Sequence, residues 1–306
     1  MATVTPDTRK AGAITQLAPG LRCILAPNAS PMTYTGTNTY LLGTRDIAVI
    51  DPGPPDEAHL EAILGALDAH QRISHIMVTH SHIDHSPLAM VLAQITGAKV
   101  YGFGDSRAGR APVMASFTDV GGGEGVDATF MPDISLAHED CVSGSDWSLT
   151  ALHTPGHMGN HLCFHWPQGD AIFTGDLVMG WATSMVSPPD GHLTDFMISL
   201  EMLAARNGDE IYYSGHGQPI TAPVERLQEL LSHRRMRETQ ILDALRREPL
   251  TPKTLTDRIY TDINPALLRA AERNVLAHLI DLTERKKVKP DGKLGTSAVF
   301  SLITEF

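Results

Sequence analysis

Seven side chains of this chain have the chemistry of a metal site. Four of them fall in one short run, His80-Ser81-His82-Ile83-Asp84-His85. Imidazole and carboxylate groups are the ligands that zinc, iron and manganese prefer. Three imidazoles and a carboxylate so close together have no obvious use in a core or on a surface, so we predict that they bind metal. The other three candidate ligands are His157, Asp176 and His216.

The local pattern around the cluster predicts a loop between a strand and a helix. Ile76 to Val78 form a short apolar run that is typical of a buried parallel strand. Pro87 then precedes apolar residues at helical spacing from Leu88 to Ile95, which predicts a helix. Ligands of open α/β sheets gather outside the carboxyl ends of the strands, and the cluster falls at such a position.

The three remaining ligand candidates repeat one arrangement. Each follows an apolar stretch that predicts a strand, at 149–152, 171–173 and 210–213, and then a turn of small residues. The turns read H-T-P-G-H, T-G-D and S-G-H-G, and glycine beside a ligand lets the backbone approach the site closely. Three occurrences of the same arrangement favour a common site.

The chain of 306 residues divides into three predicted parts. Residues 1–18 are expected to form a loose arm, and residues 19–220 alternate strands and helices. A helix predicted at 193–203 should pack on this part and wall the pocket, and the Gly-rich stretch 102–132 predicts a flexible surface insertion, whose position relative to the site mouth stays open. Residues 221–306 predict helices at 224–247, 251–260 and 265–285, followed by a basic hairpin, which together indicate a winged-helix-like module.

The candidate ligands and their order resemble the metallo-β-lactamase superfamily. Asp51-Pro52-Gly53, after the apolar run 47–50, is similar to the earlier D-x-G element of that superfamily. The resemblance implies an α/β fold, a four-layer αββα sandwich, with a dinuclear metal site at one edge. It also implies that His80, His82 and His157 hold one metal, that Asp84, His85 and His216 hold the other, and that Asp176 bridges them.

A finer resemblance concerns the two ends of the catalytic part. Residues 31–41 and the segment that begins at Ser232-His233-Arg234 resemble the branch containing the mitochondrial β-lactamase-like endoribonuclease, which carries a small C-terminal winged-helix-like domain. Related members hydrolyse thioesters, including fungal polyketide-type thioesterases. β-Lactams fit less well, because the C-terminal extension and the Asp84 ligand pattern suit other branches.

The expected activity is that of a dinuclear metal-dependent hydrolase. Two divalent ions, zinc or else iron or manganese, would share a bridging hydroxide that attacks the substrate. Asp84 is the expected catalytic residue, because it is both a ligand and a proton acceptor. Asn160 and His161 are candidates for substrate binding. His75 is expected to pack and His153 to brace its loop by a hydrogen bond, whereas surface or half-buried positions are expected for His59, His70, His138, His192, His233 and His278.

The sequence leaves three functions open. The first is hydrolysis of a thioester or related acyl ester, the second is cleavage of single-stranded RNA, and the third is a non-catalytic metal-binding regulatory module. The net charge is −11, but the 15 Lys and Arg against 12 Asp and Glu from Thr221 onward give +3, so the rest carries −14. The acidic catalytic part disfavours a polyanion and favours a small acyl substrate.

Composition also predicts the surroundings of the protein. Cys23, Cys141 and Cys163 lie far apart, which indicates a reducing, cytoplasmic location rather than a disulfide framework. The first residues lack the basic start and apolar run of a signal peptide. We expect no membrane span, and the long C-terminal helices could support a homodimer.

Overall fold

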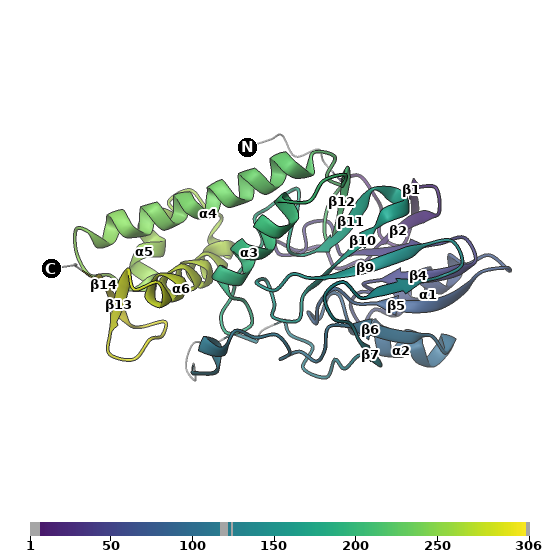
Figure 1. Cartoon of the computed structure of the whole chain (residues 1–306), viewed down its shortest axis with the longest axis horizontal. Coiled ribbons are helices and arrows are strands. Elements are labelled where there is room, and N and C mark those ends of the chain that lie inside the picture. Colours follow the sequence, from purple (N-terminus) through teal and green to yellow (C-terminus); the bar gives the residue numbers. More distant parts are fainter. Residues whose placement is uncertain (1–6, 117–121, 124, 304–306) are drawn as a thin grey trace.

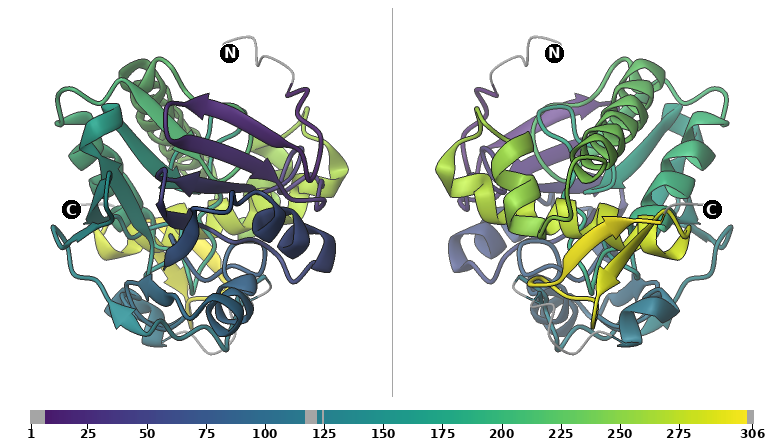
Figure 2. Two further views of the ribbon diagram at one scale, coloured as in Figure 1. Left: turned by 90° about the vertical axis from the view of Figure 1, so that its right-hand side faces the viewer. Right: turned by 90° about the vertical axis from the view of Figure 1, so that its left-hand side faces the viewer.

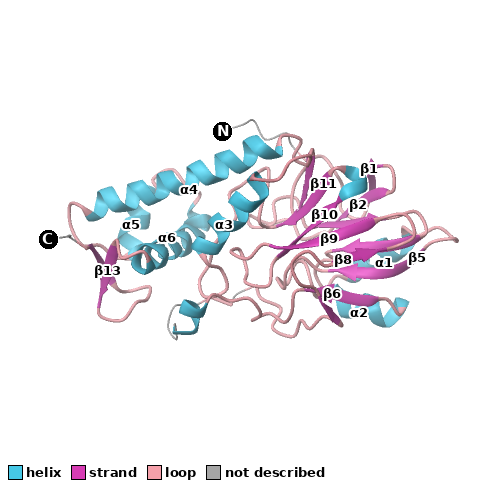
Figure 3. Cartoon of the chain, viewed as in Figure 1, coloured by secondary structure: helices cyan, strands magenta, loops and turns pink. Residues whose placement is uncertain are grey.

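The structure is a computed structural model that describes residues 7–116, 122–123 and 125–303. Two β-sheets lie face to face with helices on their outer sides, and a helical extension continues from one end (Figures 1 and 3). The predicted αββα sandwich followed by a winged-helix-like part is therefore confirmed.

The first sheet has seven strands in chain order, antiparallel from β1 to β4 and parallel from β4 to β7. Its outer face is covered by α1 (Glu57–Gly65) and α2 (Leu88–Thr96). Its strands are β1 Ile14–Ala18, β2 Leu21–Leu25, β3 Asn38–Leu42, β4 Asp46–Ile50, β5 Arg72–Met77, β6 Lys99–Gly102 and β7 Ile134–Ser135.

The second sheet has five strands in the order β12-β11-β10-β9-β8, and only β11 and β12 run parallel. Its outer face is covered by α3 (Leu193–Ala204) and by the first half of α4 (Pro223–Leu245). Its strands are β8 Cys141–Ser143, β9 Ser148–His153, β10 Leu162–Trp166, β11 Ala171–Gly175 and β12 Ile211–Ser214.

The apolar runs in the sequence exist because both faces of these strands are buried. In β4, Ala48 and Ile50 face the other sheet, whereas Ile47 and Val49 pack under the outer helices. Side chains alternate between the two faces of a strand, so a strand covered on both sides is apolar throughout. This burial fixes the register of the strands and hence the position of the loops at their ends.

The C-terminal part consists of three helices and a two-stranded wing. The second half of α4 packs with α5 (Pro252–Ile259), α6 (Leu268–Glu284), β13 (Val288–Asp291) and β14 (Val299–Leu302). These elements gather at one end of the sandwich (Figure 2). Short 3₁₀ turns occur at Pro112–Ser116, Pro167–Gly169 and Pro265–Leu267.

Helix α4 belongs to two hydrophobic cores. Leu227 and Leu230 pack on the second sheet, whereas Ile241 and Leu245 pack in the C-terminal core. With 23 residues the helix is about 35 Å long, enough to reach both. The start of α4 thus packs with the sandwich, and the division of the chain at residue 220 stays a prediction.

The expectation of a loose N-terminal arm is wrong for the residues that the structure describes. Ile14–Ala18 pairs with β2 as the edge strand of the first sheet. Before it, Arg9 Nη2 donates to the carbonyl of Gly217 at 2.7 Å, and the Arg9 guanidinium also pairs with Asp7. Residues 1–6 lie outside the described residues.

Three histidines expected at the surface or half-buried are buried instead. His59 and His278 are each only 1% exposed, and His192 is buried between Asp195 and Glu284, at 2.9 and 2.8 Å. His59 lies on the inward face of α1, and His278 lies in a stretch of α6 that is buried on all sides. The sequence pattern missed them because an imidazole is both apolar and polar and therefore fits either environment. His233 is half-buried, and His70 and His138 are exposed, as expected.

Two further observations concern the surroundings of the protein. The three cysteines are free, as the absence of pairing motifs predicted. Within the described part of the chain, no helix has the length and apolar character needed to cross a membrane.

Candidate metal centre

All seven candidate ligands come from loops at the carboxyl ends of strands. The cluster from His80 to His85 follows β5, and His157, Asp176 and His216 follow β9, β11 and β12. The ligand-bearing loops thus come from both sheets and meet at one edge of the sandwich. The structure brings these residues together although they are separated by up to 136 positions (216 − 80) in the sequence.

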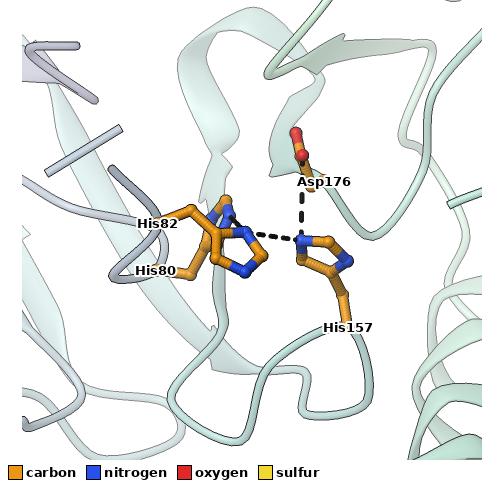
Figure 4. Close-up of side chains that lie close together, drawn as sticks. All are labelled: His80, His82, His157 and Asp176. Atoms are coloured by element: carbon orange, nitrogen blue, oxygen red, sulfur yellow. Dashed lines mark hydrogen bonds and ion pairs between the residues drawn. The ribbon is translucent and has the colours of Figure 1, made fainter. Parts of the chain in front are cut away.

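The first group consists of His80, His82, His157 and Asp176. The Nε2 atoms of His80 and His157 lie 2.9 and 3.0 Å from Nδ1 of His82. Asp176 Oδ2 lies 3.7 Å from Nε2 of His157. Figure 4 shows these rings turned toward one another beside the carboxylate, so their nitrogen atoms converge on one point.

The second group consists of Asp84, His85 and His216. Asp84 Oδ2 lies 3.5 Å from His85 Nε2 and 3.2 Å from His216 Nε2, and the two ring nitrogens are 3.4 Å apart. Asp176 also contacts this group, with Oδ1 3.5 Å from His85 Nε2 and Oδ2 3.4 Å from His216 Nε2. The Asp176 carboxylate therefore lies between the two groups.

The protonation of the first group fits a cation. Burial, reinforced by the neighbouring imidazoles, lowers the pKa of His80 well below its usual value and that of His82 to about 3. Both rings are therefore neutral at pH 7 and offer lone pairs to a cation.

The second group has the opposite protonation. Burial disfavours the imidazolium of His216, but the carboxylates of Asp176 and Asp84 outweigh it and raise its pKa to about 9. Burial also acts against the imidazolium of His85, and the carboxylates of Asp84, Asp176 and Asp51 likewise outweigh it and raise the pKa of that ring. In the protein without metal, protons on these rings supply positive charge that a metal would replace.

Two further observations show that the residues fit a metal pair. The Oδ1 atom of Asp176 is buried and has no hydrogen-bond partner among the described residues. A Cβ added at Gly215 would overlap that oxygen and would lie 2.7 Å from His85 Cε1. The site thus keeps space and an acceptor without a hydrogen bond where the ligands meet, with only the longer 3.5 Å contact to His85 Nε2 among the described residues, and buried acceptors rarely lack a hydrogen bond without a reason.

A second layer of hydrogen bonds orients the rings. Asp51 accepts from Thr79 N and Thr79 Oγ1, each at 2.7 Å, and its Oδ2 lies 2.9 Å from His85 Nδ1. The Nδ1 atoms of His157 and His216 are bound by the backbone carbonyls of Met185 and Gly36, at 2.7 and 3.1 Å. Such contacts fix which ring nitrogen faces the metal position.

Sequence analysis found only part of this second layer. Asp51 was noted for its resemblance to a motif, but neither carbonyl has a sequence signal, because any residue supplies a backbone oxygen. The expected brace at His153 is confirmed, since its Nε2 lies 2.9 Å from the carbonyl of Gly159. His75 packs edge-on against Trp147, as expected.

The positions of Asn160 and His161 do not support their expected contact with substrate. Asn160 is 2% exposed, and its Nδ2 donates to Ser81 Oγ and to the carbonyl of Asp105. His161 is fully buried, and its Nε2 accepts from the backbone N–H of Asp176 at 3.2 Å. Both side chains hold ligand loops from behind, because the short turn after His157 directs them into the core.

A cavity of about 1110 Å³ opens at the metal-ligand residues and extends to the C-terminal helices. His82, Asp84, His157 and Asp176 form one part of its wall, and the rest is mostly apolar. The helix α3 supplies none of the wall, contrary to expectation, because its apolar face is used to cover the second sheet. Residues of α4, the segment after α5, and α6 take that place, including Arg234, Arg237, Tyr260, Leu267 and Asn274.

The end of the Gly-rich stretch, from Gly125 to Asp127, lies beside the ligand cluster, a placement that the sequence left open. Ile83 N donates to the carbonyl of Gly125 at 2.8 Å, and Asp127 Oδ2 accepts from Ser86 Oγ at 2.9 Å. Gly125 and Asp127 also line the cavity. Residues 117–121 and 124 of the predicted insertion lie outside the described residues.

Comparison with known proteins identifies the family. Residues 32–216, which carry every candidate ligand, match the metallo-β-lactamase superfamily. The chain belongs to the metallo-β-lactamase superfamily. Residues 251–296 match the β-lactamase-associated winged helix domain, so the superfamily domain is followed by this module.

Relatives within the superfamily align over most of the chain. The β-lactamase-like protein 2 homolog of Caenorhabditis elegans is 31% identical over 269 residues, covering 86% of this chain and 83% of the relative. The atrochrysone carboxyl ACP thioesterase of Passalora fulva is 32% identical over 297 residues, covering 92% and 79%. A metallo-β-lactamase family protein from Thermus thermophilus has a similar structure, with a TM-score of 0.75, 25% identity and coverage of 94% and 100%.

Membership in the metallo-β-lactamase superfamily, together with relatives named as thioesterases, makes this protein a hydrolase. The His and Asp clusters are able to hold divalent metal.

Proposed function

We propose that this protein is a dinuclear metal-dependent thioester hydrolase. In this proposal His80, His82 and His157 hold one divalent ion, Asp84, His85 and His216 hold the second, and Asp176 contacts both. The grouping of the side chains and the position of Asp176 between the groups support this assignment. Zinc is the proposed metal, and iron and manganese are alternatives that suit the same ligands.

When bound, the metals would act as Lewis acids and provide an activated water near neutral pH. The residues of the chain would hold the reacting groups in place and move the proton. Asp84 lines the cavity, and its pKa is lowered well below the usual value: burial raises it, but His85 and His216 outweigh burial. The carboxylate is therefore ionised at neutral pH, which is the form that a metal ligand requires. Its Oδ2 is shared with Thr37, His85 and His216, which leaves Oδ1 to take the proton.

The observation that carries the proposal is the apolar cavity that ends at the metal-ligand residues. Its volume of about 1110 Å³ exceeds that of a typical small-ligand pocket, so an extended acyl group fits inside it. Met32, Met179, Trp181 and Ile259 are among the apolar side chains of its wall. A wall of this kind removes a hydrocarbon group from water, whereas a nucleic-acid strand needs a row of cations along its backbone. Among the described residues that line this cavity, the only Lys or Arg side chains are Arg234 and Arg237.

The packing of the C-terminal module also favours a small substrate. In many winged-helix proteins the third helix enters a groove of the nucleic acid. Here that helix is α6, and its residues from Val275 to Leu282 are all buried. Leu276 and Ile280 pack against Met114, and Ala277 packs on the core beside the second sheet. The stretch of α6 from Val275 to Leu282 therefore has no face left for a nucleic-acid groove.

Hydrolysis of an acyl thioester and of single-stranded RNA by the purified full chain tests the proposal. We expect turnover of the thioester that depends on added divalent metal and is nearly insensitive to salt. His82→Ala should lose metal and activity together, and His70→Ala, at an exposed position, should lose neither. RNA cleavage that weakens steeply with salt, without thioester turnover, would replace this proposal with the endonuclease. Bound metal with neither activity would indicate a regulatory module.

A further inference from the structure

Two arginines of α4 lie in the cavity wall without an ion-pair partner among the described residues. Arg234 is 3% exposed, and Arg237 is half-buried. Arg234 donates only to neutral acceptors, the carbonyl of Ser184 and Oδ1 of Asn274, and its Nε has no partner. Arg237 likewise donates only to neutral acceptors among the described residues.

Arg237 donates through Nη1 to Gln240 Oε1 at 2.9 Å and to the carbonyl of Ile259 at 3.4 Å. Its guanidinium lies over the ring of Tyr260, 4.2 Å from the centroid, and its buried Nε has no partner among the described residues. Asp262 lines the same cavity, but its carboxylate accepts from Thr261 rather than from an arginine. The planar group is thus held in one orientation while part of its hydrogen-bonding capacity is unused.

Unpaired buried cations are unusual, because removal of a charge from water is costly unless an opposite charge replaces the water. Elsewhere on the same helix, the half-buried Arg226 pairs with Glu229, and even the exposed Arg235 pairs with Glu201, both at 2.9 Å. Burial lowers the pKa of Arg234 to about 10, so it is still charged at neutral pH. The cavity wall therefore carries two arginines that form no ion pair with any carboxylate of the described residues.

The positive wall begins close to the proposed metal centre. Arg234 binds the carbonyl of Ser184, and His157 binds the next carbonyl along the chain, that of Met185. Arg237 follows one helical turn later, about 4.5 Å further along α4. An anion held here would be separated from the scissile bond by only a short length of substrate.

We propose that the cavity binds acyl thioesters whose acyl group carries a carboxylate, which pairs with Arg237 and is further attracted by the positive charge of Arg234. This inference rests on the proposed thioester hydrolysis and names its substrate class. A guanidinium binds a carboxylate through two parallel hydrogen bonds, and Arg237 is already oriented for this by Tyr260. A phosphate group of the thiol carrier, such as coenzyme A, is a less suitable partner for Arg237, because the whole pantetheine arm separates that phosphate from the thioester.

The test compares two N-acetylcysteamine thioesters of equal acyl length, glutaryl and pentanoyl, that differ only in the terminal carboxylate. The wild-type full chain should prefer the glutaryl ester by about tenfold in kcat/KM, which corresponds to about 1.4 kcal/mol. Arg237→Gln should remove the preference by raising KM for the glutaryl ester alone, and Arg237→Lys should keep part of it. Arg235→Gln is the matched control, because Arg235 is an exposed arginine on the same helix.

Equal rates for the two esters with the wild-type chain would overturn the inference, as would an equal loss for both esters in Arg237→Gln. If Arg237→Gln impairs only coenzyme A thioesters, whatever their acyl group, the arginines bind the carrier phosphates and the acyl assignment is wrong. Calorimetric binding of glutarate and of pentanoate separates this inference from the proposed activity. Tighter binding of glutarate that is lost in Arg237→Gln would support the anion site even if neither thioester is hydrolysed.

Discussion

Replacement of Asn274 by alanine should weaken metal binding, although Asn274 belongs to the C-terminal module and is not a candidate ligand. Its Oδ1 accepts from Val186 N at 3.0 Å and from Arg234 Nη1 at 2.9 Å. Arg234 also binds the carbonyl of Ser184, so the two residues hold the segment 184–186 from both ends. The carbonyl in the middle of this segment, that of Met185, orients His157 at 2.7 Å.

The structure sets the size of the effect. Asn274→Ala leaves the Val186 N–H and one guanidinium N–H without an acceptor, and each unpaired buried donor costs about 1–3 kcal/mol. We therefore expect a loss of about 2–6 kcal/mol in the free energy of unfolding. A loss of orientation at a ligand histidine lowers metal affinity about 10- to 100-fold in comparable sites. Both effects should occur together if segment 184–186 connects the module to the centre.

The assay is competition for zinc with a chromophoric chelator, combined with thermal unfolding of the metal-free chain. Asn264→Ala is the matched control, because Asn264 caps a 3₁₀ turn of the same module at an exposed position. It should leave metal affinity unchanged. If Asn274→Ala lowers the unfolding temperature but binds zinc as tightly as the wild type, the module only stabilises the fold and our reasoning about His157 is refuted.

Three further predictions concern a glycine, a buried histidine and the metal centre. Gly156→Ala should destabilise the fold by more than about 3 kcal/mol, because φ is +138° and a Cβ would overlap the backbone of Phe196. Gly65→Ala, with open space at a helix position, should instead raise the free energy of unfolding by about 0.5–1 kcal/mol, and chemical denaturation measures both changes. Burial lowers the pKa of His59 to about 4, below its unfolded value near 6.5, so the stability that it contributes is complete above pH 6.5 and is lost as the pH falls toward 4. The wild type should lose about 2 kcal/mol more than His59→Gln between pH 7 and pH 5, and equal losses would contradict this. Metal binding at pH 7 should release protons, because the raised pKa of His216, about 9, keeps its ring protonated in the metal-free protein; calorimetry in buffers of different ionisation enthalpy detects the release, and identical heats would exclude it.

Much of the fold follows from local patterns. The helix after Pro87 and the three C-terminal helices were predicted close to their observed bounds, whereas the strand before His80 was recognised only at its end. Each of these elements is buried on defined faces, and apolar residues therefore recur at a regular spacing in its sequence. The predicted loose arm failed at Ile14–Ala18, because an edge strand that is half-exposed carries a weaker pattern.

The candidate ligands were also found from the sequence alone. Metal ligands must be His, Asp or a few other residue types, and here they converge because they follow strand ends. Both features can be recognised in the sequence. The groups that orient the ligands are harder to recognise. The carbonyls of Gly36 and Met185 bind His216 and His157, and a backbone oxygen can come from any residue.

The identities and order of the ligands, and hence the kind of chemistry, were determined by the sequence itself. Only the tertiary structure determines the cavity, because its wall combines segments that lie far apart in the sequence. These segments include Pro31, Trp181 and residues between Arg234 and Asn274. The same is true of charge compensation: Arg235 and Arg237 are two residues apart, yet only the first meets a carboxylate among the described residues, which comes from Glu201 on another helix. Pairing and burial depend on which elements meet in space, and no spacing within one segment records that.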